Sequence, residues 1–190
     1  ALYPSITEHY ESLELFVQDY INSTANILIL NSVPGMGKTT FLKMLMDATK
    51  DSCLVTYSSE LSEMDELFAY FLTSDHKYLI IEDADTYMTS RDKDSSNHNM
   101  KKLLNVTDGL TARSDKKIIF TSNLPNIHTI DSALIRVGRC HKVLELRPLT
   151  IDQANTFYDR RGIRPKLYEA SITTGKAKFT VAELYGYING

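Results

Sequence analysis

The sequence predicts an α/β fold in which a mainly parallel five-stranded sheet is flanked by helices and followed by a small partial helical lid. The first observation is that short apolar runs of strand length alternate with amphipathic helical segments, which is typical of a parallel sheet. The second is that this alternation stops at Pro148, beyond which only helical patterns follow. We therefore divide the chain into an α/β domain over residues 1–148 and a lid over 149–190.

The predicted strands share one signature, a mostly apolar run too short for a buried helix. They cover residues 27–30, 53–57, 78–81, 117–121 and 143–146. Because parallel strands bring their carboxyl ends to one edge of a sheet, and ligands of such folds bind beyond that edge, polar residues after these strands are candidate site residues.

Helices are predicted where apolar residues recur at helical spacing. A capping box at Ser5 to Glu8 predicts a first helix that reaches about Ile21. Asp131 is expected to cap a short helix carrying Leu134 and Ile135. Further helices are expected after the first three strands and in the lid, where capping boxes begin at Thr150 and Thr180; residues 86–99 lack periodicity and are expected to form an exposed loop.

The stretch Ser-Val-Pro-Gly-Met-Gly-Lys-Thr at 32–39 follows the first strand and opens a helix. It matches the P-loop pattern G-x-x-x-x-G-K-[ST] except that Ser32 replaces the first glycine. Glycines let the backbone amides converge on an anion, Lys38 is placed for the outer phosphates, and Thr39 offers a hydroxyl to Mg²⁺. The alternative is a glycine-rich turn that binds nothing. We predict a P-loop NTPase whose phosphate-binding residues are Pro34, Gly35, Met36, Gly37, Lys38, Thr39 and Thr40.

The third strand ends on Glu82 and Asp83, which look like a Walker B element in reversed order. Glu82 would orient the water ligands of a metal also held by Thr39, and Asp83 would position or deprotonate the attacking water. Acidic residues after a strand are also common in turns. Asn123, after the fourth strand, is a candidate to hydrogen-bond a γ-phosphate or the attacking water, or alternatively an ordinary turn residue.

Residues 131–141, Asp-Ser-Ala-Leu-Ile-Arg-Val-Gly-Arg-Cys-His, resemble the second region of homology of the AAA ATPase family. The resemblance implies that Arg136 and Arg139 project into the active site of a neighbouring subunit, where such an arginine contributes roughly 10³ to 10⁵ in rate. The alternative is a solvated arginine pair. Val137 and His141 depart from the family pattern without changing either arginine.

Within that family the chain is most similar to the mitochondrial translocase of the folded Rieske protein, the bc1-complex chaperone type. Three segments carry this likeness, residues 82–85, 103–110 and 179–187. The resemblance implies ATP and Mg²⁺ as ligands, a homo-oligomeric ring of six or seven subunits, and adenine contacts from the segment around Leu2 to Ile6 and from the lid. It does not transfer the Rieske substrate.

The expected function is a ring ATPase that remodels or moves a macromolecule. The net charge of −3 gives no general attraction to nucleic acid, so a protein substrate is favoured over DNA. A DNA-handling AAA protein and a nucleotide-gated scaffold with little turnover are the alternatives. Two separate thiols, Cys53 and Cys140, suggest a reducing intracellular compartment, most simply the cytoplasm, and no apolar run suggests membrane contact by this segment.

Overall fold

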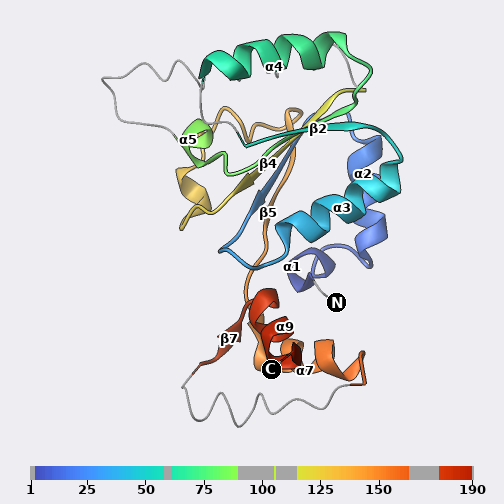
Figure 1. Ribbon diagram of the computed structural model, residues 1–190, viewed down its shortest axis with the longest axis vertical. Helices are drawn as coiled ribbons and strands as arrows, with labels where there is room; N and C mark the ends of the chain where they lie inside the picture. Colours follow the sequence, from blue (N-terminus) through green and yellow to red (C-terminus); the bar gives the residue numbers. More distant parts are fainter. Residues whose placement is uncertain (1–2, 58–60, 90–104, 106–114, 163–175, 190) are drawn as a thin grey trace.

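The computed structural model describes residues 3–57, 61–89, 105, 115–162 and 176–189. Its main feature is a parallel five-stranded sheet, as predicted (Figure 1). The strands lie in the order β2-β3-β4-β1-β5. Because β1 lies between β4 and β5, the loop that follows it is next to the carboxyl end of β4, and the carboxyl end of β3 is one strand further along. The strands are β1 (Ile27–Asn31), β2 (Cys53–Thr56), β3 (Tyr78–Ile81), β4 (Lys117–Ser122) and β5 (Cys140–Glu145).

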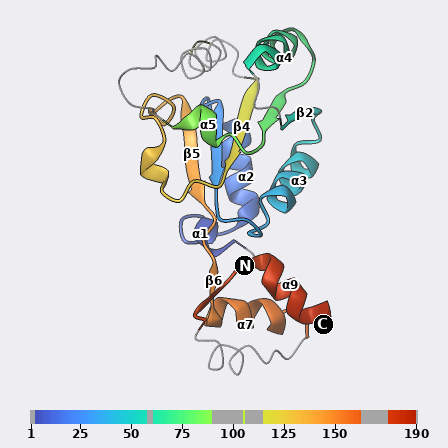
Figure 2. The same ribbon diagram turned by 60° about the vertical axis from the view of Figure 1, so that its left-hand side comes forward.

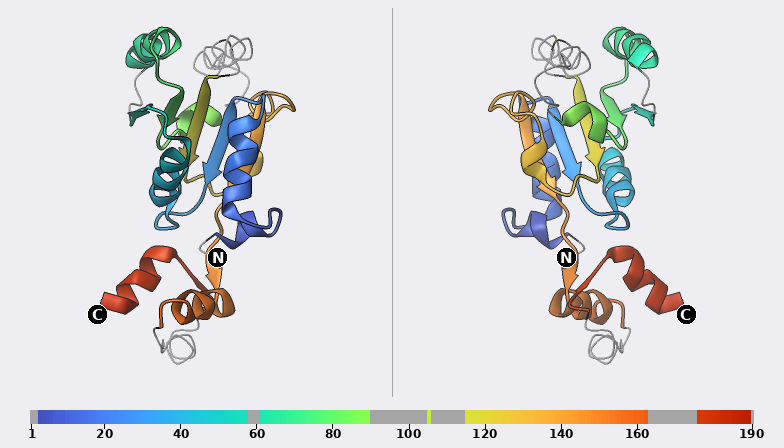
Figure 3. Two further views of the ribbon diagram at one scale, coloured as in Figure 1. Left: turned by 90° about the vertical axis from the view of Figure 1, so that its right-hand side faces the viewer. Right: turned by 90° about the vertical axis from the view of Figure 1, so that its left-hand side faces the viewer.

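Helices cover both faces of the sheet (Figures 1 and 3). Leu28 and Leu30 of β1 pack in one buried cluster with α2 (Leu13–Asn22) and α3 (Lys38–Thr49). The alternate residues Ile27 and Ile29 pack in a second cluster on the other face, because successive strand side chains point to opposite faces. That second cluster includes residues of α4 (Leu61–Thr73) and α5 (Asp85–Met88).

The C-terminal segment, called the lid below, lies beneath the sheet and beside the N-terminus (Figure 2). Both predicted capping boxes form: Thr150 Oγ1 accepts from the Gln153 amide, and Thr180 Oγ1 from the Glu183 amide. The expectation of helices alone was wrong, since β6 and β7 pair in antiparallel fashion. The lid elements are β6 (Leu149–Thr150), α7 (Ile151–Asp159), β7 (Lys178–Phe179) and α9 (Val181–Asn189).

The predicted first helix is divided in two, α1 (Pro4–Thr7) and α2. Ser12, rather than Ser5, provides the cap, accepting a hydrogen bond from the Leu15 amide. The break lets Tyr10 turn back onto α2, where its ring meets Phe16 edge-on and its hydroxyl donates to Asp19. Tertiary packing therefore overrides a helical pattern that was continuous in sequence.

Two other local predictions were wrong. Helix α5 spans Asp85–Met88 with Met88 fully buried, although an exposed loop was expected from residue 86 onward. Asp131 Oδ1 does accept from the Ala133 amide, but turns follow it instead of a helix, after the short 3-10 helix η1 (Ile127–Thr129). The predicted features at 90–104 and 106–114 lie outside the described residues.

Among the residues that the structure describes, no helix is both long and apolar enough to cross a membrane.

Candidate active site

The loop between β1 and α3 has the backbone that the motif requires. Gly35 and Gly37 have φ values of +82° and +85°, a region that L-residues rarely adopt. Gly37 is the N-cap of α3, so the unpaired amides and positive dipole end of the first turn face outward from the loop. This geometry is suited to an anion such as a phosphate chain.

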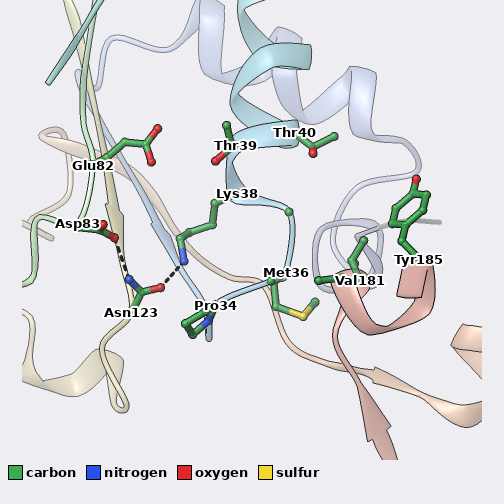
Figure 4. A pocket seen from close by; sticks show the side chains of 13 residues that line it. Pro34, Met36, Lys38, Thr39, Thr40, Glu82, Asp83, Asn123, Val181 and Tyr185 are labelled. Carbon is green, nitrogen blue, oxygen red and sulfur yellow. Dashed lines mark hydrogen bonds between the residues drawn. The ribbon is translucent and has the colours of Figure 1, made fainter. Parts of the chain in front are cut away.

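A cavity of about 560 Å³ opens in front of this loop. Figure 4 shows side chains from four separate segments converging on it: the P-loop, the end of β3, the end of β4 and the first turns of α9. The structure thus brings together every predicted phosphate-binding, metal-binding and catalytic residue except the two arginines. The lining residues are Pro34, Gly35, Met36, Gly37, Lys38, Thr39, Thr40, Glu82, Asp83, Asn123, Val181, Ala182 and Tyr185.

Lys38 points across the cavity and contacts oxygen atoms of its own chain. Its Nζ donates to Asn123 Oδ1 at 2.5 Å, and to the hydroxyl and carbonyl oxygens of Ser32 at 3.1 and 3.2 Å. Burial lowers the pKa of Lys38, and the nearby carboxylates of Asp83, Asp85 and Glu82 oppose this. Ser32, which replaces the usual glycine, therefore accepts hydrogen bonds from the lysine alongside Asn123.

The two Walker B carboxylates have different surroundings. Glu82 faces the same space as Thr39 (Figure 4), and burial, followed by repulsion from Asp83, raises the pKa of its carboxyl. Asp83 adopts a positive φ of 52° and accepts a hydrogen bond from Asn123 Nδ2 at 2.8 Å. Its amide donates to Thr121 Oγ1 at 3.1 Å, a part-buried contact that the sequence analysis did not assign.

The arginines lie elsewhere. The amides of Arg139 and Cys140 both donate to the Arg136 carbonyl, closing a turn in which Gly138 has a φ of +87°. The Arg139 carbonyl accepts from the amides of Asn26 and Ile27 at 3.1 and 3.0 Å. Since these amides are at the amino end of β1 and the P-loop follows its carboxyl end, the arginines and the cavity occupy opposite edges of the sheet.

Tyr3 supports the P-loop from below. Its side chain is 4% exposed, and its hydroxyl donates to the Gly37 carbonyl at 3.0 Å. Its ring also packs edge-on against Phe41 of α3. The N-terminal segment was expected to contribute adenine contacts, and that stays a prediction; what the structure shows is the contact of Tyr3 with the loop backbone.

Tyr185 closes the lid side of the cavity and was missed by the sequence analysis. The Arg161 guanidinium donates to the Tyr185 hydroxyl at 3.0 Å, and Phe157 packs edge-on against its ring. The signal was present, because Val181 and Tyr185 are four residues apart and so share one face of a helix.

The donor set fits a magnesium-bound nucleoside triphosphate. Backbone amides, the Lys38 ammonium and the helix N-terminus suit the phosphate oxygens. The Thr39 hydroxyl and the Glu82 carboxylate are hard oxygen donors of the kind Mg²⁺ prefers, which usually keeps several of its waters.

Residues 28–148, more than half of the chain, match the family described as "ATPase family associated with various cellular activities (AAA)". Over 133 residues the chain is 32% identical to a 26S proteasome regulatory subunit 4 homolog of Dictyostelium discoideum, covering 62% of this chain and 30% of the relative. A subunit 4 homolog B of Arabidopsis thaliana is 31% identical over the same length, with the same coverage.

A relative from Schizosaccharomyces pombe, named "Probable mitochondrial chaperone bcs1", is 27% identical over 139 residues, covering 70% of this chain and 30% of its own. The chain therefore spans about 30% of the length of these relatives. Proteins of this family use ATP with Mg²⁺, in agreement with the donors that line the cavity. The P-loop, the fold and the family match lead to one conclusion: the chain belongs to the AAA family of ATPases.

Proposed function

We propose that this chain is the motor domain of a ring ATPase that hydrolyses ATP at the contacts between subunits. The resulting conformational changes would remodel or move a protein. The observation that carries the proposal is the placement of Arg136 and Arg139 at the sheet edge opposite the chain's own cavity. This placement supports a role for the two arginines at the cavity of another copy rather than at their own.

The length of β1 separates the two groups. The Arg139 carbonyl is bound at Asn26 and Ile27, and four residue steps of about 3.3 Å each lead from there to the end of the strand. Arg136 is exposed, and Val137 beside it is 103% exposed.

The residues in the cavity have separate tasks. ATP supplies the phosphoanhydride bond, and Mg²⁺ neutralises charge on its phosphates. Lys38 would exchange its contacts with Asn123 and Ser32 for phosphate oxygens. Glu82 would orient metal-bound water, Asp83 would accept a proton from the attacking water, and Asn123 would hold that water in line.

A protein substrate is supported by the relatives, whose names describe a proteasome regulatory subunit and a mitochondrial chaperone. The net charge of −3 gives no general attraction to DNA. Proteins of this family typically form rings. A homo-oligomer of six or seven subunits, in which each interface pairs one cavity with one arginine turn, satisfies the geometry because such head-to-tail contacts close into rings.

One observation favours a second candidate, a nucleotide-gated scaffold. Asp83, the proposed base, is hydrogen-bonded to Asn123 and is one methylene shorter than glutamate, so turnover could be very slow. Steady-state phosphate release separates the two. A scaffold would assemble with ATP and release phosphate at a negligible rate.

The trans arrangement is tested by mixing two inactive variants of the intact protein. Lys38→Ala removes the phosphate contact but keeps the arginines, and Arg139→Ala does the reverse. Random mixing at equal amounts should restore phosphate release to roughly a quarter of the wild-type rate, since one interface in four then has both parts.

Arg147→Ala is the matched control, because Arg147 is half-exposed and pairs with Glu8 and Glu145 outside the cavity. Arg147→Ala should release phosphate on its own, without being mixed with a second variant. Absence of rescue at every mixing ratio, with both variants folded and assembled, would overturn the proposal.

A further inference from the structure

We propose that Asn31 and Asp85 are positioning residues that fix Asn123 by gripping the backbone on both sides of it. The inference rests on the proposed function, because Asn123 matters to hydrolysis only if hydrolysis occurs. Neither residue is among those that line the cavity in front of the P-loop. Both act through the placement of the Asn123 carboxamide between Lys38 and Asp83.

Asn31 holds the residue after Asn123. It is the last residue of β1 and only 2% exposed, in a strand whose other residues are all apolar. Its Nδ2 donates to the Leu124 carbonyl at 3.0 Å, and its Oδ1 accepts from the Leu124 amide at 2.9 Å. The same Oδ1 accepts from the Ser122 hydroxyl at 2.7 Å. One side-chain amide thus satisfies both the backbone N–H and the backbone carbonyl of Leu124, the residue that follows Asn123.

Asp85 binds the backbone of Asn123 on its amino-terminal side. Its Oδ1 accepts from the Asn123 amide at 3.0 Å. Asp85 begins α5, and the Thr89 hydroxyl donates to its carbonyl at 3.2 Å. Consecutive peptide amides, those of Asn123 and Leu124, are therefore bound by side chains from two different strand ends, β3 and β1.

The exact position of the Asn123 carboxamide is what should matter for the rate of hydrolysis. The Asn123 carboxamide is the hydrogen-bond bridge between Lys38 and Asp83, at 2.5 and 2.8 Å. Polar groups shielded from water are costly unless they are satisfied, and Asp85 and Asn31 satisfy the part-buried backbone amides of Asn123 and Leu124. A displacement of about 1 Å of such a group costs on the order of a hundredfold in rate.

The same hydrogen bonds also connect the segment around Asn123 to the P-loop. Asn31 precedes Ser32, whose amide donates to the Ser122 carbonyl at 3.1 Å and whose hydroxyl accepts from Lys38. A shift at the start of the P-loop is thus transmitted to residues 122–124 through hydrogen bonds, rather than through loosely packed side chains.

The test compares Asn31→Leu with Asn26→Leu. Asn26 is also fully buried and also donates from Nδ2 to a backbone carbonyl, that of Lys116, but at the opposite end of β1. We expect Asn31→Leu to lower kcat about 10- to 100-fold, with a change in KM for ATP under about threefold. Asn26→Leu should affect kcat much less at comparable loss of thermal stability.

A double-mutant cycle shows whether the effect passes through Asn123. In an Asn123→Ala background, Asn31→Leu should lower kcat less than about twofold further, because the group it positions is gone. Asp85→Ala should behave like Asn31→Leu, and Asp85→Asn, which keeps an accepting oxygen, should restore most activity. Equal effects in both backgrounds, or a kcat loss no larger than that of Asn26→Leu, would overturn the inference.

Hydrogen exchange separates this inference from the proposed function. The Leu124 amide should lose protection in Asn31→Leu and the Asn123 amide in Asp85→Ala, while both stay protected in Asn26→Leu. If the wild-type protein releases no phosphate, the proposed function fails. If hydrogen exchange at the Asn123 and Leu124 amides is unchanged in these variants, the positioning role of Asn31 and Asp85 is refuted independently.

Discussion

The Nζ of Lys38 and the Oδ1 of Asn123 lie 2.5 Å apart, at the ends of two different strand-to-loop connections. The lysine that the P-loop offers to phosphates is thus already bound to a neutral amide and to Ser32. Since its partners are uncharged, a triphosphate competes well for it. Charge-assisted contacts with phosphate are roughly twice as strong as contacts with neutral groups.

Removal of the Ser32 hydroxyl should strengthen nucleotide binding. In Ser32→Ala, Lys38 loses one competing acceptor, and because such a hydrogen bond contributes about 1 kcal/mol net, affinity for ATP should rise about fivefold. The measurement is titration of a non-hydrolysable ATP analogue followed by calorimetry. Ser23→Ala, at the end of α2 and far from the cavity, should leave affinity unchanged. Weaker binding in Ser32→Ala would show that the hydroxyl assists the ligand directly.

Gly35 and Gly162 form a pair that separates backbone strain from a steric clash. Both have positive φ, +82° and +67°, so alanine at either costs about 1 kcal/mol in stability. A Cβ at Gly35 would also lie 3.1 Å from the Ala182 side chain, whereas one at Gly162 would meet nothing within 4 Å.

Gly35→Ala should therefore destabilise the protein more than Gly162→Ala and weaken ATP binding about tenfold, because the P-loop and α9 are pushed apart. Chemical denaturation and nucleotide titration measure the two effects. Equal affinities in the two variants would mean that contact between α9 and the loop is irrelevant to binding.

The sequence predicted the elements whose signals are local. The apolar run before the glycines, the Gly-Lys-Thr turn and the acids after β3 each depend on neighbouring residues, and the parallel order of the strands brings them together without further information. The capping boxes at Thr150 and Thr180 formed for the same reason.

Contacts between distant residues were not predictable in this way. The break before Ser12 depends on Tyr10 packing against Phe16, and the role of Asn31 depends on backbone groups more than ninety residues away. Asn31 was visible as a polar residue that ends an apolar strand. Its partners emerge only once β1 and β4 are paired in register.

Glu82→Gln should stabilise the protein at neutral pH when neither Mg²⁺ nor nucleotide is present, while it lowers phosphate release. Burial and Asp83 raise the pKa of Glu82 above its ordinary 4.5. Between 4.5 and the folded-state pKa, the folded protein therefore binds more protons than the unfolded chain, and stability falls as pH rises through that window.

Urea unfolding across pH 4 to 8 measures this contribution as the difference between wild type and Glu82→Gln. The gain in the free energy of unfolding of Glu82→Gln over wild type should be small at acid pH. It should reach its full value above the folded-state pKa of Glu82. Glu66→Gln, on the exposed side of α4, should show no such growth with pH. A Glu82→Gln advantage that shrinks as pH rises would contradict the assigned direction.

Lys117 should make the protein more stable as the solution becomes alkaline. Its side chain is buried, with Nζ donating to the carbonyls of Ser23 and Ala25 and lying 4.8 Å from the centre of the Tyr20 ring. Burial lowers the pKa of Lys117 from 10.5 to about 8. Between these two values the unfolded chain binds more protons than the folded protein, so the free energy of unfolding rises with pH.

The contribution of Lys117 to the free energy of unfolding rises by at most about 1.4 kcal/mol per pH unit. It should appear between about pH 8 and 10.5 in urea unfolding curves, as the difference between wild type and Lys117→Met. The exposed Lys43→Met on α3 should follow the wild type throughout. Because Lys117 anchors the carboxyl end of α2 to β4, Lys117→Met should also be less stable than wild type at pH 7. Unchanged stability at pH 7 would show that water replaces Lys117 as hydrogen-bond donor to the two carbonyls without loss.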